Sequence, residues 1–310
     1  MIAALIEIVL PVFLIIGAGY LATLAKLFPQ NAIEGLMKFA TNFAIPCLLF
    51  LKVAQLDLSA AFDWRLLLSF YAGATICFFV AVIGARKIFK RRPGESIAIG
   101  FGALFSNSVL LGLPIMERAF GPDAMAGNYA IVSIHAPFCY LVGITAMEFA
   151  RADGRGTIGT VKVVTVAMFR NALAIGLGLG FIVNFSGYSI PNTAFSALNM
   201  LASAGLPAAL FGLGGVLSRY SLHKSLGEAL MISGISLFLH PIIAMGLGTV
   251  LDLPDAAMRS VVVTAAMAPG VNAYLFATMY NRAIGAAAST VLLATAISIF
   301  SATFWLGVLP

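Results

Sequence analysis

The chain has 310 residues, of which 61% are hydrophobic and only 10% are charged, and its formal net charge is +6. Soluble domains carry about 25% charged residues, so this composition excludes an ordinary soluble protein and predicts an all-α integral membrane protein held in a lipid bilayer. The positive charge does not indicate nucleic acid as a partner, because no basic face or aromatic-basic motif accompanies it. The three cysteines show no CxxC spacing, so they predict neither a metal site nor a redox pair.

Ten apolar segments follow one another along the chain, each long enough for a spanning helix, which needs about 20 mostly apolar residues. They cover residues 3–25, 31–52, 64–86, 95–119, 124–148, 163–186, 191–217, 226–250, 256–281 and 284–306. The first segment lacks the basic start of a secretory signal, so we expect it to remain as a span.

The basic residues indicate the orientation of these spans. Fourteen of the eighteen Lys and Arg residues lie in or beside the connections that follow odd-numbered spans, and four follow even-numbered spans. Positive charge concentrates on the cytoplasmic side of short loops. We therefore expect a multi-pass protein of the inner (plasma) membrane with both termini outside the cytoplasm.

Prolines recur at an interval of five spans. The second span contains Pro46 and the seventh Pro207, while the fourth carries Pro114 and the ninth Pro269. A repeat of five spans must reverse its orientation across the membrane, so ten transmembrane helices in two inverted five-helix repeats are predicted. Paired, interrupted spans of this kind indicate the binding site of a secondary carrier. The repeats would cover residues 1–150 and 151–310.

The fourth and ninth spans predict an anion site. We expect Gly112 and Pro114 to open the helical ladder of span four and Pro269 to open that of span nine. The N-terminus of each second half-helix would then offer free N–H groups and the positive end of a helix dipole. Asn107 and Asn272 can donate hydrogen bonds to a carboxylate without carrying charge. The predicted substrate-binding residues are Asn107, Ser106, Ser108, Gly112, Pro114, Pro269, Gly270, Asn272, Tyr274 and Asn42.

Two polar residues have alternative interpretations. Asn42, one turn before Pro46, would either close the site from the second span or bond the carbonyl that the proline frees. His135 lies in the middle of the fifth span and is the candidate for proton coupling; the alternative is a neutral histidine bonded to a neighbouring carbonyl or hydroxyl.

Every Asp and Glu falls near a span end, which disfavours a cation antiporter built on a mid-membrane carboxylate pair.

Three stretches together resemble the auxin efflux carrier family, which includes the plant PIN-FORMED carriers and bacterial malonate-type transporters. They are "NSVLLGLP" in span four, "LPAALFGLGG" in span seven and "AMAPGVNAYLFATMYNRAIGAAASTVLLATAIS" across spans nine and ten. The resemblance covers nearly the whole chain and is most specific in spans nine and ten. The long cytoplasmic loop of the plant carriers is absent, so regulation through that loop cannot be transferred.

The resemblance implies a PIN-like fold of the bile acid sodium symporter type, in which spans four and nine cross at their prolines. It also implies a scaffold of spans one, two, six and seven that forms a homodimer, and a transport unit of spans three to five and eight to ten that moves like an elevator. Carried over by position, Asn107, Pro114, Pro269 and Asn272 would surround the substrate carboxylate.

The residues and the resemblance together predict a secondary transporter for small organic anions, malonate-like or auxin-like carboxylates, that works without a cofactor as a proton-coupled carrier or a uniporter. The alternative is a sodium-coupled organic anion symporter of the bile acid type, although no cluster of acidic and carbonyl ligands favours it. A membrane-embedded enzyme would need a nucleophile with a base, or a metal set. The three histidines show no such spacing, so neither an enzyme nor a metal site is expected.

Overall fold

The structure is a computed structural model and describes residues 4–151, 172–221 and 225–309. Every regular element within these residues is helical, and a single isolated bridge joins Ser106 to Pro269. Seven of the described helices are long and apolar enough to cross a membrane, which confirms an all-helical chain with several spans. They are Leu5–Leu24, Gln30–Ala54, Trp64–Lys87, Pro122–Ala150, Asn192–Leu217, Leu226–Val250 and Ile284–Val308.

The other three expected spans differ from continuous helices. Span four consists of α6 (Pro93–Leu104), the π-turn η3 (Ser108–Gly112) and α7 (Leu113–Phe120). Span nine consists of α14 (Asp255–Ala265) and α15 (Val271–Tyr280). Each piece is shorter than the roughly 20 residues that a spanning helix needs. Span six is described only as α10 (Ala172–Ser186), because its first residues lie outside the described part of the chain.

The chain divides into two compact units. Unit 1 comprises Met1–Leu10, Phe62–Val161 and Tyr220–Pro310, and unit 2 comprises Pro11–Ala61 and Lys162–Arg219. Each unit therefore combines segments from both halves of the sequence.

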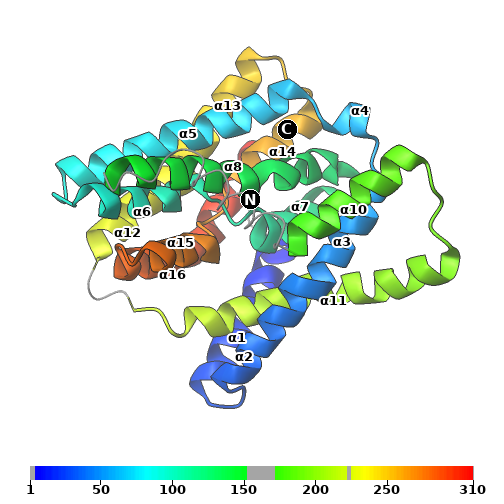
Figure 1. Cartoon of the computed structure of the whole chain (residues 1–310), viewed down its shortest axis with the longest axis horizontal. Helices are drawn as coiled ribbons and strands as arrows, with labels where there is room; N and C mark the ends of the chain where they lie inside the picture. The colour runs from blue at the N-terminus through cyan, green and yellow to red at the C-terminus, as the bar shows by residue number, and fades with distance from the viewer. Residues whose placement is uncertain (1–3, 152–171, 222–224, 310) are drawn as a thin grey trace. The chain divides into compact units, whose positions relative to one another are not determined.

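The helices of unit 1, besides α6, α7, α14 and α15, are α5 (Trp64–Lys87), α8 (Ala126–Arg151), α12 (Leu226–Gly234), α13 (His240–Val250) and α16 (Ile284–Val308), with the π-turns η1 (Ala4–Val9) and η5 (Ile235–Leu239) and the 3-10 turn η4 (Pro122–Met125). Of these helices, α5 and α8 lie side by side with α6 (Figure 1). One buried cluster includes Leu66, Phe70, Ile131 and Val261 and joins α5, α8, α13 and α14. A second buried cluster joins α5, α6, α12 and α16.

Unit 2 is packed through glycines. A Cβ atom on Gly19 would overlap the carbonyl oxygen of Phe211, and one on Gly214 would overlap that of Ile16. Small residues let the backbones of two membrane helices approach closely, which explains the close contact between α1 (Leu10–Leu24) and α11 (Asn192–Leu217). The helices of unit 2, besides α10, are α1 (Leu10–Leu24), α2 (Gln30–Phe39), α3 (Ile45–Ala54), α4 (Leu58–Ala61) and α11 (Asn192–Leu217), with the π-turn η2 (Ala40–Ala44).

Each π-turn in the described residues ends two residues before a proline. The four pairs are η1 with Pro11, η2 with Pro46, η3 with Pro114 and η5 with Pro241. In η3 the N–H of Leu113 donates to the carbonyl of Ser108, five residues back. Proline lacks an N–H, and its ring clashes with the carbonyl four residues earlier; the wider turn relieves that clash. These prolines are therefore absorbed into helices and do not end them.

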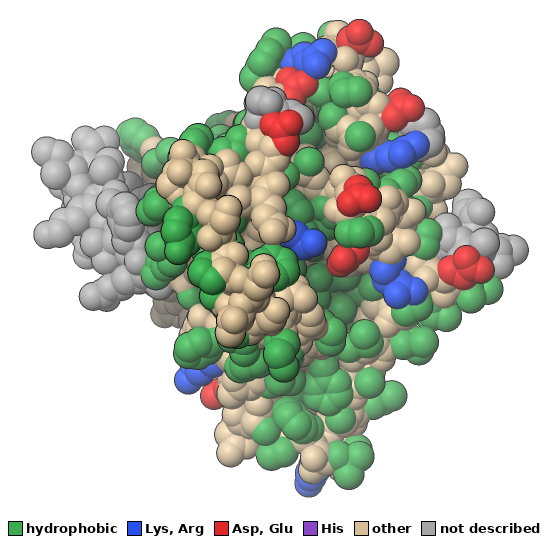
Figure 2. All heavy atoms as spheres, turned by 90° about the vertical axis from the view of Figure 1, so that its right-hand side faces the viewer, with side chains coloured by type: hydrophobic (Ala, Val, Ile, Leu, Met, Phe, Trp, Pro, Cys, Tyr) green, Lys and Arg blue, Asp and Glu red, His purple; other side chains and the backbone are tan. Residues whose placement is uncertain are grey.

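Large hydrophobic side chains lie exposed on both units, among them Phe185 (78% exposed), Met200 (77%) and Phe300 (71%). In Figure 2 hydrophobic and uncharged atoms cover much of the visible face, and charged side chains are scattered. Such surfaces mark contact with a membrane.

Candidate functional site

Two helices of unit 1 are interrupted, and their interruptions pair with each other. The first lies between α6 and η3, at Phe105–Asn107, and the second lies between α14 and α15, at Ala266–Gly270. The N–H of Asn107 donates to the carbonyl of Ala268 at 2.8 Å, and the N–H of Gly270 donates to the carbonyl of Phe105 at 3.1 Å. The pairing is a short antiparallel bridge centred on Ser106 and Pro269.

The bridge lowers the free-energy cost of placing interrupted backbone inside a membrane. Each unpaired backbone group in the bilayer interior costs several kcal/mol, and the bridge pairs two donors and two carbonyls. Its hydrogen bonds come from the neighbours of Pro269, so the missing N–H of this residue costs nothing there. Proline also pushes the preceding residue away from the helical region, which explains why α14 stops before Ala268.

The interruption of span four is not where Gly112 and Pro114 predicted it. These two residues lie at the N-terminus of α7, inside a helix that continues from η3. The break lies instead at the Ser106–Asn107–Ser108 triplet. Ser and Asn compete with the helical backbone for hydrogen bonds and favour helix starts, and Asn107 is indeed the N-cap of η3. In span nine, Pro269 does lie within the interruption.

We call the two paired interruptions, Phe105–Asn107 and Ala266–Gly270, the crossing. Two buried polar side-chain atoms there have no hydrogen-bond partner among the described residues. They are Oγ of Ser106 and Nδ2 of Asn107, on residues that are 4% and 6% exposed. A buried, unsatisfied polar group costs about 1–3 kcal/mol. A Cβ atom on Gly270 would lie 3.7 Å from Cγ of Asn107, so the glycine faces this amide. An unsatisfied donor held here is suited to a ligand that accepts hydrogen bonds.

Both second half-helices begin directly after the bridge. The N–H groups of Leu111 and Gly112 donate to the carbonyl of Asn107, whereas no acceptor among the described backbone carbonyls serves Val271 or Asn272. The first N–H groups of a helix have no partner within it, and they form the positive end of its dipole. The crossing therefore places the unpaired N–H groups at the start of α15 beside the start of η3 and the amide of Asn107.

Asn272 lies in the first turn of α15 and is half-buried. Its Oδ1 accepts a hydrogen bond from the hydroxyl of Tyr140, on α8, at 3.2 Å. Tyr274, also on α15, packs its ring against Tyr220, with ring centroids 4.9 Å apart. Sequence reasoning did not single out Tyr140.

His135, on α8, lies next to the bridge, and its side chain is only 2% exposed. Its Nε2 is 3.1 Å from the carbonyl oxygen of Ser106. A carbonyl only accepts, so Nε2 carries the proton and donates it to this bond. The geometry matches the interpretation of a histidine that bonds a neighbouring carbonyl, and it places the ring against the crossing.

Most of the predicted substrate-binding residues share this crossing. Ser106, Asn107, Ser108, Gly112, Pro269 and Gly270 are buried there, and Asn272 and Tyr274 follow on α15. Pro114 is buried one turn further on, in α7. Asn42 belongs to unit 2, and its role in the site stays a prediction. It lies in η2 of unit 2 with an exposed side chain.

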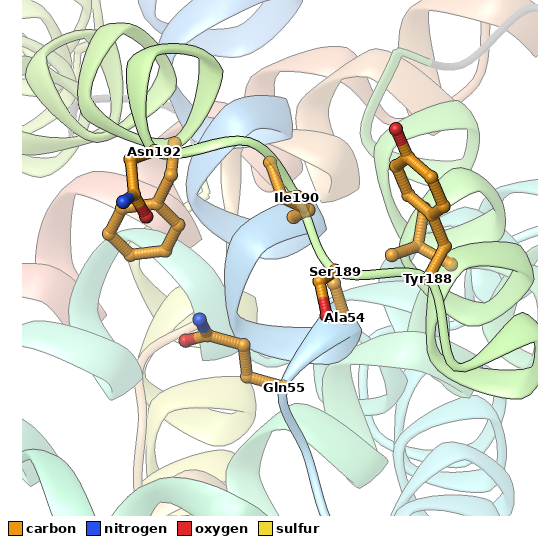
Figure 3. A pocket seen from close by; sticks show the side chains of 8 residues that line it. Ala54, Gln55, Tyr188, Ser189, Ile190 and Asn192 are labelled. Atoms are coloured by element: carbon orange, nitrogen blue, oxygen red, sulfur yellow. The ribbon is translucent and has the colours of Figure 1, made fainter.

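Unit 2 contains a separate hollow of about 420 Å³ at the ends of α3 and α10 and the start of α11 (Figure 3). Its polar residues, such as Gln55 and Asn192, are exposed. Because it holds no buried, unpartnered polar atom among the described residues, it lacks the feature that distinguishes the crossing. The lining residues are Ala54, Gln55, Val183, Tyr188, Ser189, Ile190, Asn192 and Phe195.

Several membrane-crossing helices, with an interrupted pair that buries unsatisfied donors, define the class of membrane transporters. The sequence pattern of the membrane transport protein family matches residues 4–306. The chain belongs to this family, the auxin efflux carrier family, as the resemblance indicated.

Three similar proteins come from two bacteria and an archaeon. The uncharacterized transporter YfdV of Escherichia coli is 23% identical over 276 residues, which cover 88% of this chain and 87% of that protein. An uncharacterized transporter of Methanothermobacter thermautotrophicus is 25% identical and covers 96% of both chains. A protein of Rhizobium meliloti, named as a candidate malonate transporter, is 25% identical over 97% of this chain and 94% of its own.

Proposed function

We propose that this protein is a secondary transporter that moves small organic anions across the membrane and binds their carboxylate at the crossing of spans four and nine. The observation that carries the proposal is the buried, unpartnered Nδ2 of Asn107 beside the start of α15. A carboxylate would accept hydrogen bonds from this donor and from the free N–H groups of the half-helix.

The charge of the crossing supports an anion over a cation. Residues 96–116 and 256–281, which contain both interruptions, include no Asp or Glu. Cation sites are built from carboxylates and carbonyl oxygens. Here the polar groups that lack partners include an amide N–H donor, and the half-helix ends carry partial positive charge.

We further propose ten transmembrane helices in two inverted five-helix repeats and an elevator-type movement in which unit 1 carries the site. The division of the chain supports this: expected spans three to five and eight to ten fall within unit 1, and spans two, six and seven fall within unit 2. Span one is divided at Leu10. A homodimer through unit 2, and termini outside the cytoplasm, complete the proposal for a plasma-membrane carrier.

Malonate is the first substrate to test, because a relative carries that name. In liposomes that contain the purified protein, we expect uptake of labelled malonate. Asn107→Ala and Asn272→Ala should each lower uptake about tenfold or more, since a hydrogen bond to a charged group contributes about 1.5–3 kcal/mol. Asn199→Ala removes an exposed amide on α11 and is the matched control. Uptake that is equal in all three variants would refute the site.

Coupling is tested on the same liposomes. His135→Gln keeps an N–H donor for the carbonyl of Ser106 but cannot titrate. If His135 couples transport to protons, wild-type uptake will follow a pH gradient and the variant will not. Uptake that ignores both pH and sodium gradients identifies a uniporter, and uptake that requires sodium identifies the symporter alternative.

A further inference from the structure

Tyr140 makes a side-chain hydrogen bond to one of the two asparagines of the crossing, Asn272. Its hydroxyl donates to Oδ1 of Asn272 at 3.2 Å. This is the only side-chain hydrogen bond of Asn272 among the described residues. Asn107 has no such partner, and its Nδ2 is buried without a hydrogen bond.

An amide side chain has one accepting end and one donating end. A rotation of 180° about its last bond exchanges the two ends, and only one orientation presents N–H to a carboxylate. The other presents an oxygen, which would repel it. In the structure the Tyr140 hydroxyl donates to Oδ1 of Asn272 and leaves Nδ2 pointing away from Tyr140. A phenol hydroxyl can also accept, so the hydrogen bond holds the amide in place, and a carboxylate, which needs a donor, favours the orientation that the structure shows.

Tyr140 is itself held in place by aromatic rings. Its ring centroid is 5.5 Å from that of Phe101 on α6 and 5.9 Å from that of Phe105 in the interruption. One turn further along α8, a Cβ atom on Gly143 would lie 2.5 Å from the ring of Phe101. Because Gly143 has no side chain, α8 approaches closely enough for the Tyr140 hydroxyl to reach Asn272.

We propose that Tyr140 is a positioning residue, which holds the amide of Asn272 so that its N–H donor faces the substrate carboxylate. This inference rests on the proposed function, because it assigns an orientation to a donor of the same site. The site then has one amide held by a hydrogen bond before binding and one, that of Asn107, whose Nδ2 has no partner until a ligand binds. A donor fixed in advance loses less entropy when the ligand binds.

The test is Tyr140→Phe, which removes the hydroxyl and keeps the ring. The KM for malonate should rise about three- to tenfold, the range that one hydrogen bond supplies, while the maximal rate stays within about twofold of wild type. Tyr71→Phe is the matched control, because the Tyr71 hydroxyl donates to the carbonyl of Ile131 at 2.7 Å in the same unit. It should leave KM unchanged. An unaltered KM in Tyr140→Phe, or an equal rise in both variants, overturns the inference.

A second measurement needs no substrate. The side-chain amide of Asn272 can be observed by NMR in protein labelled with ¹⁵N-asparagine, and it is assigned by the loss of its signal in Asn272→Ala. We expect Tyr140→Phe to shift this signal and Tyr71→Phe to leave it in place. A signal that Tyr140→Phe does not move overturns the positioning role. Wild-type protein that neither binds nor transports carboxylates overturns the proposed function, and the NMR result still decides whether the Tyr140 hydroxyl holds the amide of Asn272.

Discussion

The Cβ atom of Asn107 lies 3.6 Å from the position that a Cβ atom on Gly270 would occupy. These two residues are the N-caps of η3 and α15. The crossing therefore brings the two half-helix starts into direct contact.

The first prediction tests this contact by cross-linking. Disulfides require Cβ atoms about 3.5–4.5 Å apart, so the pair Asn107→Cys and Gly270→Cys should form a disulfide under mild oxidation. The native Cys47, Cys77 and Cys139 are first replaced by alanine. Mass spectrometry of proteolytic fragments should then find the peptides around positions 107 and 270 joined.

The control for this experiment is the pair Asn107→Cys and Gly285→Cys. A Cβ atom on Gly285 has no neighbour within 4 Å, so this pair should remain reduced under the same conditions. If both pairs stay reduced, the crossing described above does not form in the protein in its membrane.

The second prediction separates the stability of the site from its function. Nδ2 of Asn107 is buried without a partner, and the side chain makes no capping hydrogen bond. Replacing an unsatisfied polar group with an apolar one is close to neutral or stabilising. Asn107→Ala should therefore keep or raise the melting temperature while uptake falls. A loss of more than about 2 kcal/mol would show that the amide holds the fold together and is not reserved for a ligand.

The sequence is a good guide to the spans and a poor one to the place where they are interrupted. Span lengths follow directly from hydrophobicity, so α5, α11 and α16 begin and end within a few residues of the expected segments. The break predicted at Pro114 was wrong because a π-turn accommodates this proline within a helix. The Ser106–Asn107–Ser108 triplet, by contrast, has the residue types that favour a helix start. A proline alone does not reveal which turn will absorb it.

Tyr140 could not be found from the sequence. It lies in an apolar span and resembles an ordinary core aromatic. Its partner Asn272 is 132 positions away, and no local pattern reports a contact between residues so far apart. The residues of the proposed anion site are easier to single out from the sequence, because polar side chains beside prolines stand out within apolar segments.

The third prediction concerns the packing of unit 2. Gly19→Ala places a methyl group against the carbonyl oxygen of Phe211, and neither backbone can move without separating α1 from α11. We expect a loss of about 2 kcal/mol or more, at the upper end of overpacking costs. Thermal denaturation in detergent measures it. Gly17→Ala, two residues earlier on α1, meets nothing within 4 Å and should be neutral or slightly stabilising. Equal melting temperatures for the two variants would contradict the close approach of these helices.

The fourth prediction concerns pH and the start of α5. Asp63 caps this helix by accepting a hydrogen bond from the N–H of Arg65 at 2.8 Å, and its carboxylate also binds the Arg65 guanidinium at 2.7 Å. The side-chain hydrogen bond from Arg65 lowers the pKa of Asp63 below its ordinary value.

Because the folded-state pKa is lowered, the ionised carboxylate stabilises the folded protein at pH values above the ordinary pKa of about 3.9. This contribution is lost as the pH falls below that value and through the lowered folded-state pKa. Asp63→Asn keeps a good capping residue and removes the charge. The variant should thus be less stable than wild type near pH 7, by no more than about 1 kcal/mol because the pair is partly exposed. The difference in melting temperature should shrink at acidic pH. A difference that stays constant from pH 7 to below the ordinary pKa would show that the charge of Asp63 does not contribute to stability.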